Sequence, residues 1–440
     1  MTQQICCVEL PEMIAGTFIS TERQAREAED AIAELDRALS SEQVLKSIVE
    51  GLPREVVDGV RRSLATERRE RAELLVAYQK ARAGDFSLLR EQAGNDPGAF
   101  LIVARIIRGF SQKDLARKLG LREQAIQRWE IEKYRSISLS NYQKVAQTLG
   151  VRWKMSDIAL IDGQSPPIYD VARDDLTKVL RHARDNGWLE TAETSDENAI
   201  ATLVRHVGDH VIRYGTPSLL RTGLNVVDHS HDWSLLSWKA QVTRRAEAII
   251  AEAKPKYRPI NVSWLIELVH LSQLDDGPKR ARDLLLQNGI VLIAEPQISG
   301  MSVDGAAFLA DEVPVIGMTL LRDTLDNFWF TLFHEIAHIV LHYRTGLSSG
   351  FFDDVTSPEV DEFENEANQF AANLLIPEEV WVRSPARIAR AAEPVEKLAN
   401  QLKISPAIVF GRIRMERNDY RIFSNKLGRG TVRKQLLING

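Results

Sequence analysis

The 440-residue chain is poor in the features that mark secreted and membrane proteins. It contains only two cysteines, and because Cys6 and Cys7 are adjacent they can neither cross-link distant segments nor supply the spacing of a metal site. No apolar run approaches the roughly 18 residues of a membrane span, and the first residues lack the basic region of a signal peptide. We therefore expect a cytoplasmic protein with no membrane partner.

Histidine is also scarce, with nine in the chain, yet two of them lie four residues apart in residues 334–338, which read HEIAH. A chance match to His-Glu-x-x-His should occur in about one such chain in a hundred. The flanking residues 328–333 and 339–341 are apolar around most of a helix, as in a helix buried beside a cleft. Burying two histidines and a glutamate there is costly unless they are paired or bind a metal. The pattern therefore predicts a metal site.

Residues four apart on a helix share one face, so His334 and His338 can bind one ion while Glu335 reaches its water. A zinc ion, which we expect at one per chain, would lower the pKa of that water and polarise a peptide carbonyl, with Glu335 as the general base. A third histidine ten residues after the first, as in metzincins, would fall on Arg344, so that class is excluded. The motif predicts a zinc peptidase whose third protein ligand is of another type.

A second amphipathic helix, predicted over residues 361–376 and ended by Pro377, supplies carboxylates for that third position. Glu364 is the third ligand that we predict, and Glu366 is the reserve candidate. Asn368 follows Glu364 by one turn, where its side-chain oxygen is expected to hold a ligand histidine in the right tautomer.

His342 lies one further turn along the first helix. Three ligands in a row on a straight helix cannot all reach a tetrahedral ion, because His334 and His342 would be about 12 Å apart at roughly 1.5 Å per residue. We therefore do not count His342 as a ligand. His342 and Tyr343 stay open candidates for the residue that stabilises the tetrahedral oxyanion.

The segment FTLFHEIAH at residues 330–338, followed by ENEANQFAANLLIP at residues 364–377, resembles the ImmA/IrrE family of zinc metallo-endopeptidases. The resemblance covers about residues 236–440 and implies an α+β, gluzincin-like domain in which His334, His338 and a helix glutamate bind the metal. An exposed edge of its sheet would be able to hold an extended substrate by main-chain hydrogen bonds. Three β-like runs are expected to form that small sheet, at residues 290–294, 306–310 and 313–316.

A second motif lies upstream, between Gly98 and Val151, where the chain reads as four or five short helices. Ser111 is placed to cap a helix that begins at Gln112. When Gln112 is counted as the first of twenty residues, a small residue stands where two helices cross and a glycine stands in the turn. These two residues are Ala116 and Gly120, and the predicted core positions hold Leu115, Leu119, Leu121 and Ile126. The segment resembles the Cro/C1 or XRE class of helix-turn-helix DNA-binding domains.

In that class the second helix, here expected from about Arg122 to Glu130, enters the major groove of double-stranded DNA. The segment from Gly98 to Val151 holds ten basic and four acidic side chains, a balance of +6, in a chain whose net charge is −5. A basic module in an acidic protein suits contact with phosphates. The alternative is a helix-turn-helix that docks another protein. The side chains expected to face bases or phosphates are Arg122, Glu123, Gln124, Gln127 and Arg128.

The rest of the chain is mainly helical in pattern, so we expect a mostly α, multidomain fold. Residues 17–96 are rich in Ala, Glu, Arg and Leu and predict a helical hairpin or coiled coil, whose face suits pairing in a homodimer. Residues 395–414 repeat the helix-turn-helix pattern weakly, with Lys403 in place of the turn glycine, and are assigned to the peptidase domain. The predicted domains are an N-terminal tail at 1–16, the hairpin at 17–96, the helix-turn-helix at 97–152, a helical connecting region at 153–235 and the peptidase domain at 236–440.

We therefore expect a DNA-binding transcription regulator with a zinc-dependent endopeptidase domain that cleaves a regulatory protein. The family resemblance implies that the substrate is a repressor or another bound regulator. The rival hypothesis is a non-enzymatic repressor or antitoxin in which the metal domain acts only as a sensor or docking module. The complete set of catalytic residues favours the enzyme. A housekeeping endopeptidase is disfavoured because it would leave the basic helix-turn-helix without a task.

Overall fold

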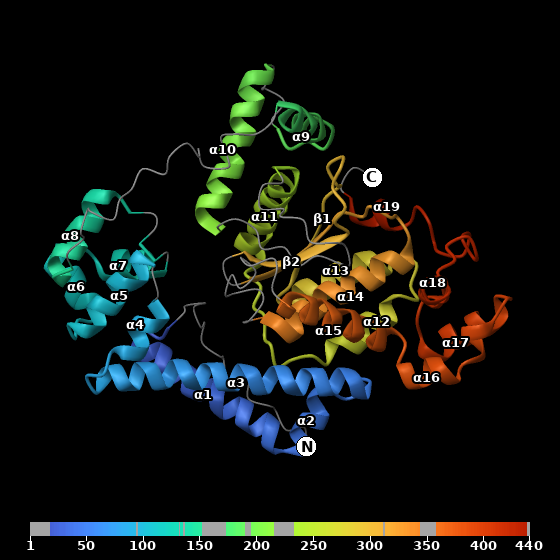
Figure 1. Cartoon of the computed structure of the whole chain (residues 1–440), viewed down its shortest axis with the longest axis horizontal. Helices are drawn as coiled ribbons and strands as arrows, with labels where there is room; N and C mark the ends of the chain where they lie inside the picture. Colours follow the sequence, from blue (N-terminus) through green and yellow to red (C-terminus); the bar gives the residue numbers. More distant parts are fainter. Residues whose placement is uncertain are drawn as a thin grey trace. The chain divides into compact units, whose positions relative to one another are not determined.

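The structure, a computed structural model, describes the chain except for its ends and several connecting segments (Figure 1). The described residues form two compact units, one within Met1–Leu45 and Leu64–Asp162 and the other within Lys46–Ser63 and Gly163–Gly440. The five domain limits expected from the sequence are finer than this division and stay predictions. The tail expected at 1–16 lies outside the described residues. Those described are 18–93, 96–131, 133–134, 137–151, 173–189, 195–214, 233–310, 313–343 and 358–437.

The first unit begins with a helical hairpin. α1 (Glu22–Ser40) starts with a capping box at Thr21, and it packs antiparallel to the later part of α3 (Arg54–Arg82). Buried alanines of α1 meet the apolar side of α3 around Tyr78, and Arg68 donates a 2.9 Å bond to Asp36 near the other end. The predicted hairpin is therefore present. Two short helices accompany it, α2 (Glu42–Ile48) and α4 (Ser87–Ala93).

Four helices of the first unit form the helix-turn-helix fold: α5 (Pro97–Ile107), α6 (Gln112–Leu119), α7 (Glu123–Ile131) and α8 (Leu139–Leu149). Ser111 caps α6 in a capping box with Asp114, as the sequence predicts for its side chain. Gly120 ends α6 at φ 68°, a left-handed conformation that favours glycine. Leu115, Ala116 and Ile126 are buried together in the core of this unit.

One predicted core residue of this fold is not buried. Leu121 is 40% exposed, whereas Leu119 packs against the core from its edge. The reason is local: the left-handed Gly120 turns the chain, and the Leu121 N–H bonds back to the Ala116 carbonyl at 2.9 Å. That bond holds Leu121 at the end of the turn, where its side chain stays exposed instead of entering the core.

The second unit is built on a three-stranded mixed sheet. β1 (Val291–Ala294) pairs parallel to β3 (Val313–Met318), and β2 (Gly305–Ala310) pairs antiparallel to β3. The strand order is β1-β3-β2, so β2 is an edge strand of this sheet. All three strands coincide with the predicted β-like runs to within a few residues. The expected fold, mostly α with a small C-terminal sheet, is confirmed.

Two long helices cover the two faces of the sheet. Alternate strand residues, including Val291, Phe308 and Val315, join the core with Trp238 and Val242 of α11 (Trp233–Ala253). The opposite face meets α14 (Leu325–His342), which carries the HEIAH segment. The sheet therefore supports the predicted metal helix from behind.

Further helices complete this unit. α18 (Pro406–Glu416) packs against α14, and it forms a helical pair with α17 (Glu393–Leu402). The turn between the two helices is Lys403, held at φ 54°. Val395, Ala399 and Val409 of this pair are fully buried, so the weak repeat of the helix-turn-helix pattern packs beside the metal helix. The remaining elements are α9 (Arg173–Asp185), α10 (Asp196–Tyr214), α12 (Trp264–Leu271), α13 (Gly277–Gln287), α15 (Pro358–Leu375), α16 (Glu378–Arg383), the 3-10 helix η4 (Pro385–Ile388) and α19 (Val432–Leu436).

Helix α3 contributes to both units, because its first ten residues belong to the second unit and the remainder to the first. In the second unit, the Ser63 hydroxyl donates a 2.9 Å bond to the Val340 carbonyl of α14, and Gly59 lies against Leu341. No described helix is both long and apolar enough to cross a membrane.

Candidate metal centre and nucleic-acid interface

The HEIAH segment lies at the centre of a helix that is apolar on nearly every side. Phe328, Trp329 and Phe333 are buried in the turns before it, so α14 runs through the interior of the second unit. His334, Glu335 and His338 have no exposed surface. Three polar groups buried this deeply need a partner that offsets the loss of their hydration.

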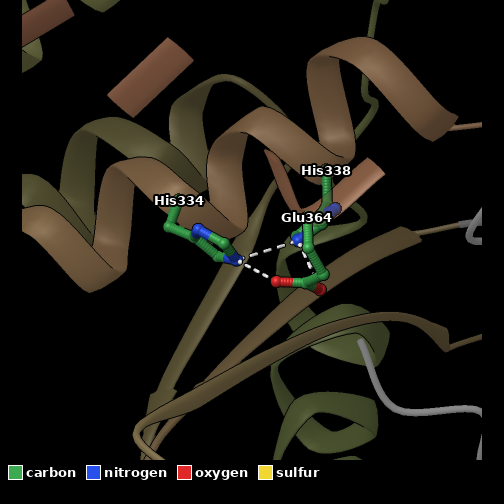
Figure 2. A group of neighbouring side chains, drawn as sticks. All are labelled: His334, His338 and Glu364. Atoms are coloured by element: carbon green, nitrogen blue, oxygen red, sulfur yellow. Dashed lines mark hydrogen bonds and ion pairs between the residues drawn. The ribbon is translucent and has the colours of Figure 1, made fainter. Parts of the chain in front are cut away.

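The two histidines meet a carboxylate from the next helix (Figure 2). The Nε2 atoms of His334 and His338 are 3.0 Å apart, and the carboxylate oxygens of Glu364 lie 3.2 Å from the first and 3.4 Å from the second. Figure 2 shows the three side chains turned toward one another beside the strands of the sheet. Ligand atoms about 2.0–2.1 Å from a tetrahedral zinc ion are themselves about 3.3 Å apart, so the three observed separations suit zinc.

A fourth side chain supports this group, as the sequence predicts. The Nδ1 atom of His334 lies 3.1 Å from Oδ1 of Asn368, on the same face of α15 as Glu364. An amide oxygen accepts a hydrogen bond, so this contact selects the tautomer with its proton on Nδ1 and leaves Nε2 free to bind a metal. Asn368 therefore orients His334 toward the position between the three donors.

The reserve candidate, Glu366, points elsewhere. Its carboxylate lies 3.7 Å from Nε2 of His342 and 3.5 Å from the guanidinium of Arg62, and it is not part of the donor group. His342 is buried, and its ring lies against that of Phe363, tilted by 47° with 4.5 Å between centroids. His342 thus links α14 to α15 and takes no place among the three donors.

Tyr343, the other candidate for the oxyanion, ends α14. Its ring lies 5.2 Å from that of Tyr257, between centroids. Neither His342 nor Tyr343 is one of the three clustered donors, and both stay candidates for that role.

Protonation within the metal-free group follows from burial and from mutual contact. Burial lowers the pKa of His338, whereas for His334 the effect of burial is outweighed by its bond to Glu364 and by the charges of Glu335 and Glu364, which raise its pKa. Burial alone would raise the pKa of Glu364, but its bonds to both histidines hold that pKa at about 2. Glu364 is therefore ionised, which is the form that binds a cation.

Glu335 stands next to this group in a different setting. Burial raises the pKa of its carboxyl to about 8, opposed by the charge of His334 and by the nearby N–H of Ala307. Among the described residues, neither carboxylate oxygen has a hydrogen-bond partner. A carboxyl with a pKa near neutrality can take up and release a proton in the same reaction.

Sequence reasoning missed the neighbours that come from outside the two motifs. Gly305 of β2 lies against Glu335, and Arg62 of α3 reaches Glu366. No spacing rule connects these residues with the metal motif, since they are 30 and 304 positions from their partners. A glycine at the start of a strand that faces the HEIAH helix is a weak signal that is meaningful only once the strand register is known.

The second helix of the helix-turn-helix presents the predicted residues to solvent. Along α7, Ile126 and Trp129 are buried, and the five predicted contact residues, of which Arg122 directly precedes the helix, are exposed. Gln127 and Glu123 lie 3.5 Å apart on that outer face, one turn from each other. Those five residues are Arg122, Glu123, Gln124, Gln127 and Arg128.

Comparison with known families accounts for both regions. Residues 289–414 match the family model described as an IrrE N-terminal-like domain, and residues 103–154 match a helix-turn-helix model. The chain carries an IrrE-like domain. Both resemblances drawn from the sequence are thereby confirmed. Among curated proteins and solved structures there is no match to this chain.

The IrrE-like domain is metallopeptidase-like, and its matched residues contain all three strands, α14, α15 and the complete donor group. With the helix-turn-helix, it makes the chain a DNA-binding transcription regulator with a metallopeptidase-like domain. The α3 residues that contact α14 lie outside the segment that matches the IrrE-like domain. This chain therefore packs an additional element against the metal helix.

Proposed function

We propose that this protein is a zinc-dependent endopeptidase that cleaves a regulatory protein, and that it binds double-stranded DNA through its helix-turn-helix as a homodimer. The observation that supports the enzymatic part most strongly is the convergence of His334, His338 and Glu364 beside a buried acid, Glu335. A site that only sensed a metal would need the three donors but not the fourth group.

The donors fit zinc by type as well as by spacing. Two imidazoles and one carboxylate are the ligand set of several zinc peptidases, and such a set leaves a fourth position for water or substrate. When bound there, zinc supplies a Lewis acid that polarises a peptide carbonyl and acidifies a water molecule. His334, His338 and Glu364 would hold the ion, and Asn368 would hold His334 in the tautomer that binding requires.

Glu335 performs the proton transfers in this mechanism. Its carboxylate accepts one proton from the attacking water as the new C–O bond forms on the scissile carbonyl carbon. It then gives that proton to the peptide nitrogen as the C–N bond breaks, leaving one new carboxyl group and one new amine. A bound dication favours the ionised form of Glu335, so the group is ready to act as a base despite its burial.

Strand β2 is the edge of the sheet nearest to Glu335 and is the element that we propose holds an extended substrate. Recognition of DNA is assigned to the exposed face of α7, where glutamine and arginine can bond base edges and phosphates. Domains of this class usually bind two half-sites as dimers, which is the reason for proposing a homodimer. The bound regulator would be the substrate, so that cleavage changes transcription at the same site.

The enzymatic proposal is tested by comparing the wild-type protein with Glu335→Gln in cells that contain the candidate partners. We expect about one zinc ion per chain in both purified proteins, because Glu335 is not a proposed ligand. New protein N-termini should form only with the wild type. Equal fragments from both proteins would remove the peptidase assignment and favour the sensor.

A further inference from the structure

Strand β2 lies directly against the side chain of Glu335. Its residues alternate between the faces of the sheet, and Ala306 and Phe308 belong to the core on the α11 side. Gly305 is therefore on the α14 side, where a Cβ atom at this residue would be 3.1 Å from Oε1 and 3.2 Å from Cγ of Glu335. The same atom would be 2.9 Å from Cγ2 of Thr331. The bare backbone at residue 305 thus occupies the space beside the acid.

Glycine is favoured at residue 305 because a side chain would lack space there, and not because the backbone conformation is unusual. Gly305 is not among the glycines with a positive φ, and it pairs with Met318 in the regular register of the β2/β3 ladder. Any L-residue could adopt this extended backbone. The obstacle to a side chain is the contact with α14, where Thr331 is a stiff, β-branched residue that cannot turn away freely.

Packing is the main restraint on the Glu335 carboxylate among the described residues, and the N–H of Ala307 in β2 is nearby. The side chain has no exposed surface, and both of its oxygens lack a hydrogen-bond partner there. Thr331 is buried one turn earlier on the same helix and limits the space behind Glu335. A glutamate side chain with several rotatable bonds takes its position from the surfaces that it touches when the interior is close-packed.

We propose that Gly305 is a positioning residue for Glu335, and that the bare backbone of β2 sets where the carboxylate stands relative to the three donors. This inference rests on the proposed function, in which Glu335 is the general base. The nearest neighbours of a side chain at 305 belong to Thr331 and Glu335 and to none of the donors. Gly305 therefore acts on proton transfer and leaves metal binding unchanged.

The sheet offers a matched control on its opposite face. A Cβ atom on Gly317 of β3 would be 2.7 Å from Cη2 of Trp238 and 3.1 Å from Cγ1 of Val242, both on α11. Gly317→Ala therefore crowds the same sheet as Gly305→Ala without crowding Glu335. A loss that is due to general damage of the sheet should appear in both variants.

The geometric test is independent of any substrate. Crystal structures of the zinc-loaded wild type, Gly305→Ala and Gly317→Ala are compared at the Glu335 carboxylate. We expect the carboxylate to be displaced relative to the His334 and His338 Nε2 atoms only in Gly305→Ala, with zinc present in all three. A Glu335 side chain in its wild-type position in Gly305→Ala overturns the proposal, even if the protein is inactive.

The functional test uses the cellular cleavage assay and then the substrate fragment that this assay identifies. We expect kcat to fall on the order of tenfold in Gly305→Ala with little change in KM, because misplacing a catalytic group by about 1 Å can cost about a hundredfold. Gly317→Ala should keep the wild-type kcat per folded molecule. If the wild type and Glu335→Gln cleave equally, the proposed function fails, and the crystal structures still decide the role of Gly305.

Two double variants separate Glu335 from Thr331. Thr331→Ser removes the Cγ2 atom but leaves the contact with Glu335, so it should not restore kcat to Gly305→Ala. Full restoration would assign the effect to Thr331 and overturn the proposal. If Gly305→Ala does not fold, adding Glu335→Ala frees the space and should restore folding. A double variant that still fails to fold overturns the proposal as well.

Discussion

At the scale of single residues, Glu364 and Glu366 are the two candidates for the third ligand position, and they differ in the direction in which their side chains point. Glu364 faces both histidines, whereas Glu366, two positions later, faces His342 and Arg62. Residues two apart on a helix point about 200° from each other, so only one of them can reach the donors of α14. The sequence pattern is compatible with either glutamate as the ligand. It cannot distinguish them, because the rotation of α15 about its axis is set by packing.

Glu364→Gln is expected to weaken zinc binding by well over the 10–100-fold that is typical for loss of a supporting residue, because it removes a charged ligand. Glu362 lies one half-turn earlier and is exposed, so Glu362→Gln removes the same charge from α15 without touching the site. Zinc affinity is measured by competition with a chelator. Equal losses in the two variants would show that charge alone, and not ligation, accounts for the effect.

The raised pKa of Glu335 predicts a pH dependence in the metal-free protein. Its folded-state pKa of about 8 is above the ordinary value of 4.5, so between these pH values the folded chain holds a proton that the unfolded chain releases. The unfolding free energy contributed by Glu335 therefore falls as pH rises through this window. Glu335→Gln lacks this titration and should gain in Tm relative to the wild type as pH rises.

The measurement is a series of thermal melts of both metal-free proteins, with chelator, from about pH 5 to about pH 8. His334 titrates in both proteins, and the charge of Glu335 is one of the causes that raise its pKa. Its titration in the wild type therefore acts in the same direction, and the Tm difference reports Glu335 and His334 together. A Tm difference that is constant over this range, or that shrinks as pH rises, would contradict the burial of an acid at this position.

At the scale of elements, the helix-turn-helix is held together by a buried ion pair that connects α5 with α7. The guanidinium of Arg105 donates two bonds to Glu130, at 2.5 and 2.9 Å, and both side chains are almost fully buried. Gln112 of α6 adds a 2.8 Å bond to the same carboxylate. The pair therefore joins three helices of the DNA-binding fold and fixes the angle of α7.

Arg105→Ala leaves the Glu130 carboxylate buried without its main partner, and such a loss typically costs about 3–5 kcal/mol. We expect faster hydrogen exchange of the amides in α5, α6 and α7 within the full chain. Arg117→Ala is the matched control, because its 3.6 Å pair with Asp114 is largely exposed to solvent. Similar exchange in the two variants would mean that the buried pair adds little to the fold.

The position of each short strand in the sheet depends on the elements around it. The β-branched and apolar residues at 290–294, 306–310 and 313–316 predict three strands. They do not predict the strand order β1-β3-β2. A run of four to six apolar residues does not determine which strand it pairs with, because strand pairing depends on the connections and on the helices that cover each face of the sheet. The placement of Gly305 against Glu335 follows from this order.

At the scale of the whole molecule, the residues proposed to contact DNA and the proposed metal donors belong to different compact units. Gln124→Ala with Arg128→Ala should weaken operator binding and relax its sequence choice, because both exposed side chains are expected to contact DNA. The same double variant should keep its zinc and its cleavage of a partner. Glu335→Gln should show the reverse pattern, with normal DNA binding and no cleavage.

These four properties are measured on the same purified proteins by footprinting, zinc analysis and fragment mapping. An unchanged footprint for the double variant would favour a docking role for the helix-turn-helix. Loss of DNA binding in Glu335→Gln would contradict the independence of the two sites. Helix α3 is the element to examine in that event, since its residues are shared between the units.

Features that arise from spacing along one helix or one turn could be predicted from the residues alone. The pair His334 and His338, the cap at Ser111 and the left-handed Gly120 all depend on contacts within a few residues, where helix geometry fixes which side chains meet. The outward face of α7 followed from the same periodicity. The exposed Leu121 is the local exception, because a turn and not a helix sets its direction.

Three contacts could not be predicted before the fold was known. Glu364 and not Glu366 joins the histidines, β2 lies against Glu335, and the first turns of α3 pack against α14. Each of these contacts joins segments far apart in the sequence, and each depends on the rotation and register of whole elements. Those are set by the close packing of both faces of the sheet, a property of all the buried residues together and of no single motif.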